Sequence, residues 1–201
     1  MKAIVAKSLL NSYFYPEYRK IVTDLLAQGL STGNVQSEDL THYSELNETR
    51  MNRLEKTIVV PEENASVLRN LKNDYIWLVI SEGWCGDAAQ LLPVFYKMAN
   101  ESNKIDLKIV FRDANDELMD LFLTNGSKSI PKLIVLNKET MEVLGNFGPR
   151  PKEAADLVIN YKKEFGIIDE TIKTNLQLWY LHDKGLSTQR EILKLMVDLE
   201  Q

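Results

Sequence analysis

The feature that most constrains the fold is a continuous apolar run, Tyr75–Ile80, which passes directly into the polar segment Ser81–Gly83. Its length and its β-branched and aromatic residues favour a strand that is buried on both faces. Strands of this kind are typical of sheets whose two faces are covered by helices. We therefore expect an α/β domain to be built around residues 75–80.

Short apolar runs alternate with segments of helical periodicity through the middle of the chain. These patterns predict strands at residues 57–60, 75–80, 107–111, 133–136 and from 142 onward. They predict helices at residues 62–71, 88–101, 116–123 and 154–165. The early alternation implies parallel strands joined by helical crossovers, and a late hairpin adds antiparallel strands. The predicted fold is an α/β fold with a central mixed sheet flanked by helices.

Helical patterns extend this region at both ends. Before it, Pro16 suits the first position of a helix, and Ser37 can cap a second helix. After it, Gly185 interrupts a helical pattern, and Thr188 with Glu191 fits a capping box for the last helix. We expect three parts, namely an N-terminal helical extension at 1–56, the α/β domain at 57–165 and a C-terminal helical extension at 166–201.

The composition argues against several classes of protein. Cys85 is the only cysteine among 201 residues, which excludes an intramolecular disulfide and a cysteine-rich zinc site. His42 and His182 lie apart, so we expect no metal and no cofactor. The net charge of −5 argues against nucleic acid as a partner. No apolar run is long enough to span a membrane, so we expect a cytoplasmic protein whose thiol stays reduced.

Cys85 falls where a strand ends, a glycine-flanked loop follows and a helix begins. A helix N-terminus favours a thiolate over a thiol, because it carries partial positive charge and unpaired N–H groups. Glu82 and Asp87 act against this effect, whereas Arg150 offsets these acids if it lies at the site rather than only in a rigid loop. We expect an exposed sulfur whose pKa is modestly lowered. The alternative is a buried small hydrophobic residue, the usual state of a lone cysteine.

The loop Gly83–Gly86, with the sequence G-W-C-G, resembles the thioredoxin active-site loop W-C-G-x-C. Three other segments agree in position with that family. They are Pro93, like the proline that kinks the active-site helix, Arg112–Asn115, like a strand-end segment, and Ser129–Leu133, like the segment that carries a cis-proline. The resemblance covers residues 57–165. The wider sequence around the loop is similar to a bacterial branch of thioredoxin-like proteins. The resemblance implies a thioredoxin-like fold.

Two departures from the family pattern bear on the chemistry. Ala88 stands where the second thioredoxin cysteine would be, so the chain cannot form the intramolecular disulfide of the dithiol cycle. Val79 stands where thioredoxins usually carry a buried acid that assists proton transfer to that cysteine. The two losses are coherent, because a proton relay has no use without the thiol that it serves.

The resemblance also implies which residues surround the sulfur. A cis peptide bond at Pro131 would expose the backbone of Ile130, which would then pair with an extended peptide or a thiol substrate. The loop residues themselves, apart from the resemblance, predict that Trp84 forms an apolar wall beside the sulfur and that Gly86 allows another chain to approach. Asp87 completes the predicted substrate-binding set.

Two functions follow from these residues. In the first, the protein is a monothiol redox protein, in which catalytic Cys85 forms a mixed disulfide that an external thiol resolves. In the second, it is a non-catalytic thioredoxin-fold module that binds a peptide or a protein in the groove beside Trp84 and Pro131. The expected partner is a protein or a low-molecular-weight thiol or disulfide, and we expect a monomer or a weak dimer. A peroxide-reducing function is weaker, because Glu82 occupies the position of the threonine in the peroxiredoxin motif.

Overall fold

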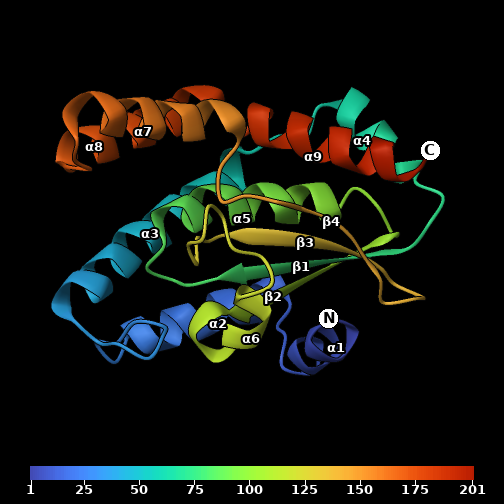
Figure 1. Ribbon diagram of the computed structural model, residues 1–201, viewed down its shortest axis with the longest axis horizontal. Helices are drawn as coiled ribbons and strands as arrows, with labels where there is room; N and C mark the ends of the chain where they lie inside the picture. The colour runs from blue at the N-terminus through green and yellow to red at the C-terminus, as the bar shows by residue number, and fades with distance from the viewer.

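The computed structural model describes all 201 residues of the chain and has a four-stranded sheet at its centre (Figure 1). The strands are β1 (Tyr75–Ser81), β2 (Ile105–Phe111), β3 (Lys132–Asn137) and β4 (Val143–Phe147), in the order β2-β1-β3-β4. β1 pairs in parallel with β2 and antiparallel with β3, and β3 pairs antiparallel with β4. The mixed sheet predicted from the sequence is confirmed.

β1 is a central strand, and all seven of its residues are buried. Val79 pairs with Ile109 of β2 on one side and with Leu133 of β3 on the other. The chain leaves the carboxyl end of this strand through a short loop and enters a long helix directly. The cysteine loop is therefore anchored to the most buried strand of the sheet.

Helices cover both faces of the sheet (Figure 1). One face carries α1 (Lys2–Leu10), α2 (Tyr15–Leu26) and the short α6 (Asp116–Met119), next to a single turn of 3-10 helix that follows β2. The other face carries α5 (Gly86–Ala99), against which α3 (Glu38–Thr57) packs. The N-terminal extension thus contributes helices to both sides of the sheet.

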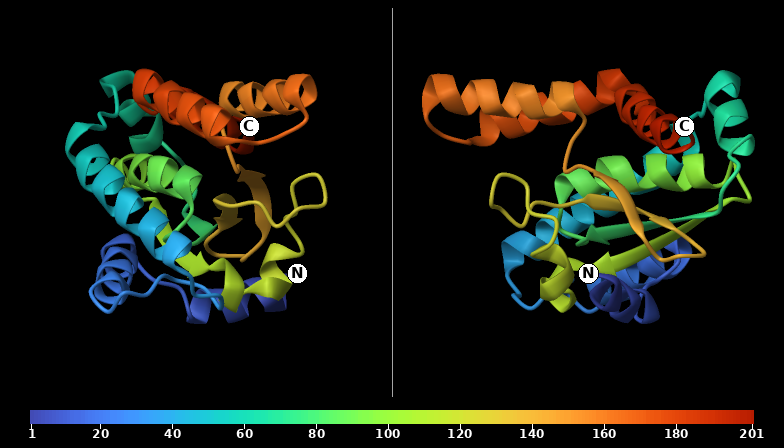
Figure 2. Two further views of the ribbon diagram at one scale, coloured as in Figure 1. Left: turned by 90° about the vertical axis from the view of Figure 1, so that its left-hand side faces the viewer. Right: turned by 45° about the vertical axis from the view of Figure 1, so that its right-hand side comes forward.

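The last three helices form an outer layer beyond α5 (Figure 1). They are α7 (Lys152–Phe165), α8 (Glu170–Asp183) and α9 (Leu186–Leu199). α9 packs against α5 and against α4 (Glu62–Arg69). α7 and α8 form a helical hairpin that projects past the end of the sheet at which α5 begins (Figure 2). This arrangement brings α8 to the N-terminus of α5.

The strand predicted at residues 57–60 is wrong. α3 runs into this segment, and the N–H of Ile58 still donates to the carbonyl of Leu54 at 2.8 Å. Val59 is 69 % exposed, and its carbonyl accepts a hydrogen bond from the Gln189 side chain of α9 at 3.0 Å. The β-branched run therefore connects two helices and pairs with no strand. Ile58 of this run packs in the core.

The predicted capping box of the last helix is also wrong. α9 begins at Leu186, with Gly185 as its N-cap at φ 78°. Thr188 is buried in the first turn, and its hydroxyl has no hydrogen-bond partner. Glu191 instead accepts from the N–H of Lys152 at 2.7 Å. The acidic residue thus joins the start of α7 to α9 rather than capping its own helix.

The other predicted elements are confirmed, although the helix predicted at residues 116–123 is limited to the single turn of α6. Ser37 caps α3 as predicted, since its hydroxyl accepts from the N–H of Leu40 at 3.2 Å. α7 ends at Gly166 in the left-handed conformation. One hydrophobic core includes residues of both extensions and of the sheet. None of the helices is both long enough and apolar enough to span a membrane.

Candidate functional site

Cys85 lies between β1 and α5, as the N-cap of that helix. Its Sγ accepts a hydrogen bond from the N–H of Ala88 at 3.5 Å and donates one to the carbonyl of Ile130 at 3.3 Å. The residue is 8 % exposed and belongs to the hydrophobic core. The structure thus brings Cys85 and Ile130 together, but the exposed sulfur predicted from the sequence is wrong.

The predicted lowering of the Cys85 pKa is wrong as well. Burial raises the pKa of the Cys85 thiol to about 12, and the Asp87 carboxylate adds to this increase. The backbone N–H groups of Ala88 and Asp87 and the charge of Arg150 act in the opposite direction without outweighing burial. The thiol is therefore protonated at neutral pH, in agreement with its hydrogen bond to Ile130.

The carboxylate of Asp87 has two partners from outside α5. Arg150 forms a bidentate pair with it, through Nε to Oδ1 at 3.0 Å and through Nη2 to Oδ2 at 2.6 Å. Tyr180 of α8 donates its hydroxyl to Oδ1 at 2.8 Å. Burial and the Asp87 carboxylate raise the pKa of Tyr180 well above its ordinary value, so the phenol remains a donor. Arg150 therefore lies at the site, beside Asp87, as one of the two interpretations of the sequence predicted.

The backbone of the loop before Cys85 is held by the N-terminal extension. The N–H of Gly83 donates to the hydroxyl of Thr32 at 2.8 Å. The carbonyl of Gly83 accepts from the side-chain amide of Asn47 in α3 at 2.9 Å. A Cβ at Gly83 would lie 3.2 Å from the side chain of Val22 in α2. Both polar groups of Gly83 are thus satisfied by the extension, which packs tightly against this residue.

Two other side chains of the loop, those of Trp84 and Glu82, differ in how deeply they are buried. Trp84 is half-buried, and the guanidinium of Arg112 lies over its ring at 4.8 Å from the centroid. Glu82 is fully buried, and its Oε1 accepts from the N–H of Asp113 at 3.0 Å while Oε2 has no partner. Burial raises the pKa of the Glu82 carboxyl. Glu82 therefore ties the end of β1 to the segment that follows β2.

Residues 130–132, whose Ile130 carbonyl accepts from the Cys85 sulfur, are held by several contacts. The Ile130–Pro131 peptide bond is cis, and both residues are buried. Lys132 is also buried, and its Nζ donates to the Thr124 hydroxyl at 2.7 Å and to the Gly148 carbonyl at 2.9 Å. Gly148 has a φ of +111°, and a Cβ there would lie 2.4 Å from the carbonyl oxygen of Pro131. The backbone therefore fits against Pro131 only because residue 148 is glycine.

Gly148→Ala is expected to destabilise the protein by about 3 kcal/mol or more, because alanine adds strain at positive φ and a clash with Pro131. Gly126→Ala is the matched control. Its φ is +76°, but nothing lies within 4 Å of the added Cβ, so we expect a loss of only about 1 kcal/mol. Denaturant unfolding measures both losses. Equal losses would contradict the importance of the contact with Pro131.

A cavity of about 620 Å³ lies over Cys85, between α3 and α8. Its base contains Trp84, Cys85, Gly86, Asp87 and Arg150. Its walls contain Leu40, Tyr43, Leu46, Arg50, Glu170, Lys173, Thr174, Leu176 and Gln177. The structure therefore gathers most of the predicted set around one cavity. The two remaining members, Ile130 and Pro131, do not line it.

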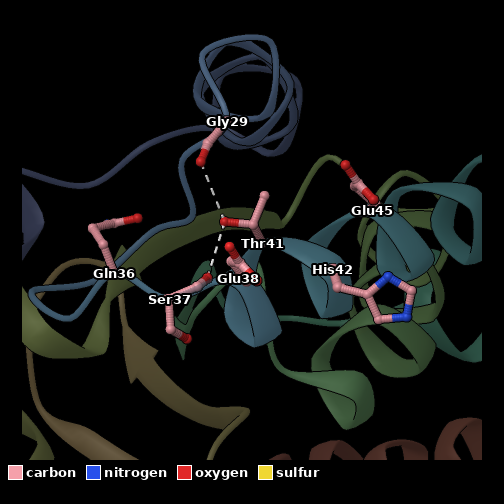
Figure 3. A pocket seen from close by; sticks show the side chains of 7 residues that line it. All are labelled: Gly29, Gln36, Ser37, Glu38, Thr41, His42 and Glu45. Carbon is pink, nitrogen blue, oxygen red and sulfur yellow. Dashed lines mark hydrogen bonds between the residues drawn. The ribbon is translucent and has the colours of Figure 1, made fainter.

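A second hollow lies at the start of α3 (Figure 3). Its lining includes no apolar side chain. The hydroxyl of Thr41 is engaged with the carbonyls of Gly29 at 3.4 Å and Ser37 at 3.2 Å. No group of three His, Cys, Asp or Glu side chains in the structure is arranged to hold a metal ion. The groups suited to chemistry therefore lie around the cavity over Cys85.

The sequence patterns do not identify the polar residues that the helical extensions add to the site, which are Asn47, Arg50, Gln177 and Tyr180. A signal exists for Asn47. It lies four positions from both Tyr43 and Met51, so it is a polar residue on the apolar face of a helix. A polar residue in such a position marks a buried contact that must be satisfied. The same spacing marks Arg50, which lies four positions from both Leu46 and Leu54, whereas no comparable signal marks Gln177.

Two solved structures are similar in fold to this chain. The first is a protein of unknown function, PA1234 from Pseudomonas aeruginosa, with a TM-score of 0.61 and 17% sequence identity over 92% of this chain and 98% of that one. The second is an HIV epitope scaffold, with a TM-score of 0.57 and 19% identity over 92% of this chain and 99% of that one. At these identities the similarity shows the fold alone.

A comparison with curated proteins finds no match. A family model described as Thioredoxin matches residues 33–163, which is more than half of the chain. The match begins just before α3 and includes the sheet, the Cys85 loop and the segment around Pro131. The chain therefore belongs to the thioredoxin family.

Proposed function

We propose that the protein holds a small disulfide ligand in the cavity over Cys85 and joins one half of it to Cys85 as a mixed disulfide. The observation that carries this proposal is that the only thiol of the chain lines a cavity of about 620 Å³. Small-ligand sites commonly have volumes of about 300–1,000 Å³. The thioredoxin fold supports the proposal, because Cys85 lies where the family resemblance places the attacking cysteine.

The proposed reaction needs only the ligand disulfide and an external thiol. The Cys85 thiolate attacks one sulfur of the disulfide, a new S–S bond forms to Sγ and the original S–S bond breaks. The departing thiolate takes up the proton that Cys85 released. An external thiol then attacks the ligand sulfur of the mixed disulfide, so that a new S–S bond joins the ligand to that thiol, the bond to Sγ breaks and Cys85 takes up the proton that the external thiol released. This second step requires another molecule, because Ala88 supplies no resolving sulfur.

The surroundings of Cys85 make both steps slow. With a pKa of about 12, only about 1 in 100,000 of the Cys85 thiols is ionised at pH 7. A thiol of high pKa is also a poor leaving group, so the mixed disulfide is resolved slowly. These properties favour a protein that retains its ligand over one that turns over many substrate molecules.

Incubation with bis(hydroxyethyl) disulfide is expected to add one hydroxyethylthio group to the protein, and the Cys85→Ser variant is expected to gain none. Below the pKa the thiolate fraction rises tenfold per pH unit, so the rate of adduct formation should rise about tenfold per unit between about pH 7 and pH 9. Intact-protein mass spectrometry measures the adduct, and added reductant should remove it.

A rate that levels off near about pH 8.5 would show an ordinary thiol and would contradict the raised pKa. No adduct at any pH would contradict the proposed function. It would favour a second candidate, a module that binds its ligand without a covalent step, which the buried and protonated state of Cys85 supports.

A further inference from the structure

We infer that the ligand of this cavity carries a carboxylate and that Arg50 and Gln177 receive it. The inference rests on the proposed function, which identifies the ligand as a small disulfide. It adds the charge of the ligand and the side chains that select it. Both side chains come from the helical walls of the cavity, Arg50 from α3 and Gln177 from α8.

The charges of the cavity lining are unbalanced. Three cations and two acids line it, and two of the cations are already paired within the protein. Arg150 pairs with Asp87, and Lys173 pairs with Glu170 at 2.6 Å. Arg50 forms no ion pair. One positive charge therefore remains uncompensated in the cavity of a chain whose net charge is −5.

Arg50 also keeps most of its hydrogen-bonding capacity free. A guanidinium has five N–H donors, and Arg50 uses Nη1 alone, which donates to Asn47 Oδ1 at 2.7 Å. Burial and the neighbouring charge of Arg53 lower the pKa of Arg50, which means that its surroundings disfavour an isolated cation. An anion in the cavity would relieve this cost, and a carboxylate matches the fork of the guanidinium.

Gln177 offers a second free donor at the same place. Its Oε1 accepts from the side-chain amide of Gln90 at 2.6 Å, which directs its Nε2 away from Gln90. A methyl group at Gly86 would lie 3.6 Å from Gln177 Nε2 and 3.9 Å from Arg50 Nη1. Gln177 Nε2 and Arg50 Nη1, which uses one of its two N–H groups for Asn47, therefore both lie close to Gly86, the residue next to Cys85.

This arrangement defines the ligand class. A carboxylate placed between Arg50 and Gln177 would bring a sulfur only a few bonds away to Cys85. The cavity volume of about 620 Å³ fits a small molecule. We therefore assign the site to a low-molecular-weight disulfide that carries a carboxylate near its sulfur.

Three small disulfides of similar length test the charge preference, namely the dianion dithiodipropionate, the neutral bis(hydroxyethyl) disulfide and the dication cystamine. Mass spectrometry measures the initial rate at which each forms an adduct on Cys85. We expect dithiodipropionate to react about tenfold faster than the neutral disulfide, and cystamine to react more slowly than either. Added salt should weaken the preference only in part, because the donors are partly buried.

The Arg50→Gln variant is expected to lower the rate ratio of anionic to neutral disulfide to about one, and Arg50→Lys should restore part of it. Arg53→Gln is the matched control, because Arg53 is an exposed cation on the same helix that does not line the cavity. It should leave the ratio as in the parent protein. A ratio near one in the parent protein, or a ratio that survives in Arg50→Gln, would overturn the inference.

A non-reactive probe separates this inference from the proposed function. Methylthiopropanoate carries a carboxylate and a thioether, so it can bind but cannot exchange. In an NMR titration of the Cys85→Ser protein it should shift the Gly86 amide and the Arg50 guanidinium, and the Arg50→Gln variant should bind it at least tenfold more weakly. If no disulfide forms an adduct but this binding occurs, the proposed covalent step is wrong and the carboxylate site stands. If adducts form but the probe shifts nothing, the carboxylate site is wrong.

Discussion

Replacing Ala88 with cysteine is expected to convert the protein from one that accumulates a mixed disulfide into one that releases its ligand. The N–H of Ala88 lies 3.5 Å from the Cys85 sulfur, and the two residues are one helical turn apart. Side chains at this spacing have Cβ atoms about 5–6 Å apart, close enough for a disulfide after a small adjustment. The new thiol should attack the adduct, expel the ligand and leave a disulfide within α5.

Intact-mass measurement distinguishes the two products. The parent protein gains one hydroxyethylthio group from bis(hydroxyethyl) disulfide, whereas Ala88→Cys should lose two hydrogens and carry no lasting adduct. Ala99→Cys is the control, because it adds a cysteine to a buried position at the far end of the same helix, about 20 Å away. It should keep the adduct on Cys85. An Ala88→Cys protein that accumulates the adduct like its parent would contradict the proposed geometry of attack.

The sheet and its flanking helices are predictable because their patterns are local. The apolar run at β1, the helical spacing of α5 and the hairpin of β3 and β4 each have the periodicity of the element that they form. The run at residues 57–60 has the same β-branched composition but forms no strand. Its hydrogen bonds go to α3 and to Gln189, and no local pattern reveals partners that lie so far along the chain.

The site is predictable only in part for the same reason. The position of Cys85 at the start of a helix follows from neighbouring residues, as does the proximity of Asp87. The burial of the sulfur does not, because the groups packed around the loop come from distant segments: Ile130 accepts from the sulfur, Asn47 of α3 binds Gly83 and Tyr180 of α8 binds Asp87. Burial then reverses the direction of the pKa shift that the helix N-terminus alone would produce.

Asp87→Asn is expected to speed the reaction of Cys85 with the neutral reagent iodoacetamide by about tenfold at pH 7. Removing the carboxylate removes a cause of the raised Cys85 pKa and leaves the opposing charge of Arg150 in place. A nearby like charge shifts a pKa by about 1–3 units, so a fall of about 2 units raises the thiolate fraction about 100-fold. Each thiolate becomes about tenfold less nucleophilic as its pKa falls, which leaves a net gain of about tenfold.

The same variant should be less stable by about 3 kcal/mol, because it leaves the partly buried Arg150 without its partner. A faster reaction could therefore arise from loosened packing instead of from charge. Tyr180→Phe separates the two causes, because it removes a hydrogen bond between α8 and Asp87 but keeps the carboxylate. We expect it to cost about 1 kcal/mol of stability and to leave the alkylation rate within about twofold of the parent. If Tyr180→Phe accelerates alkylation as much as Asp87→Asn does, access to the sulfur controls its reactivity and the carboxylate does not.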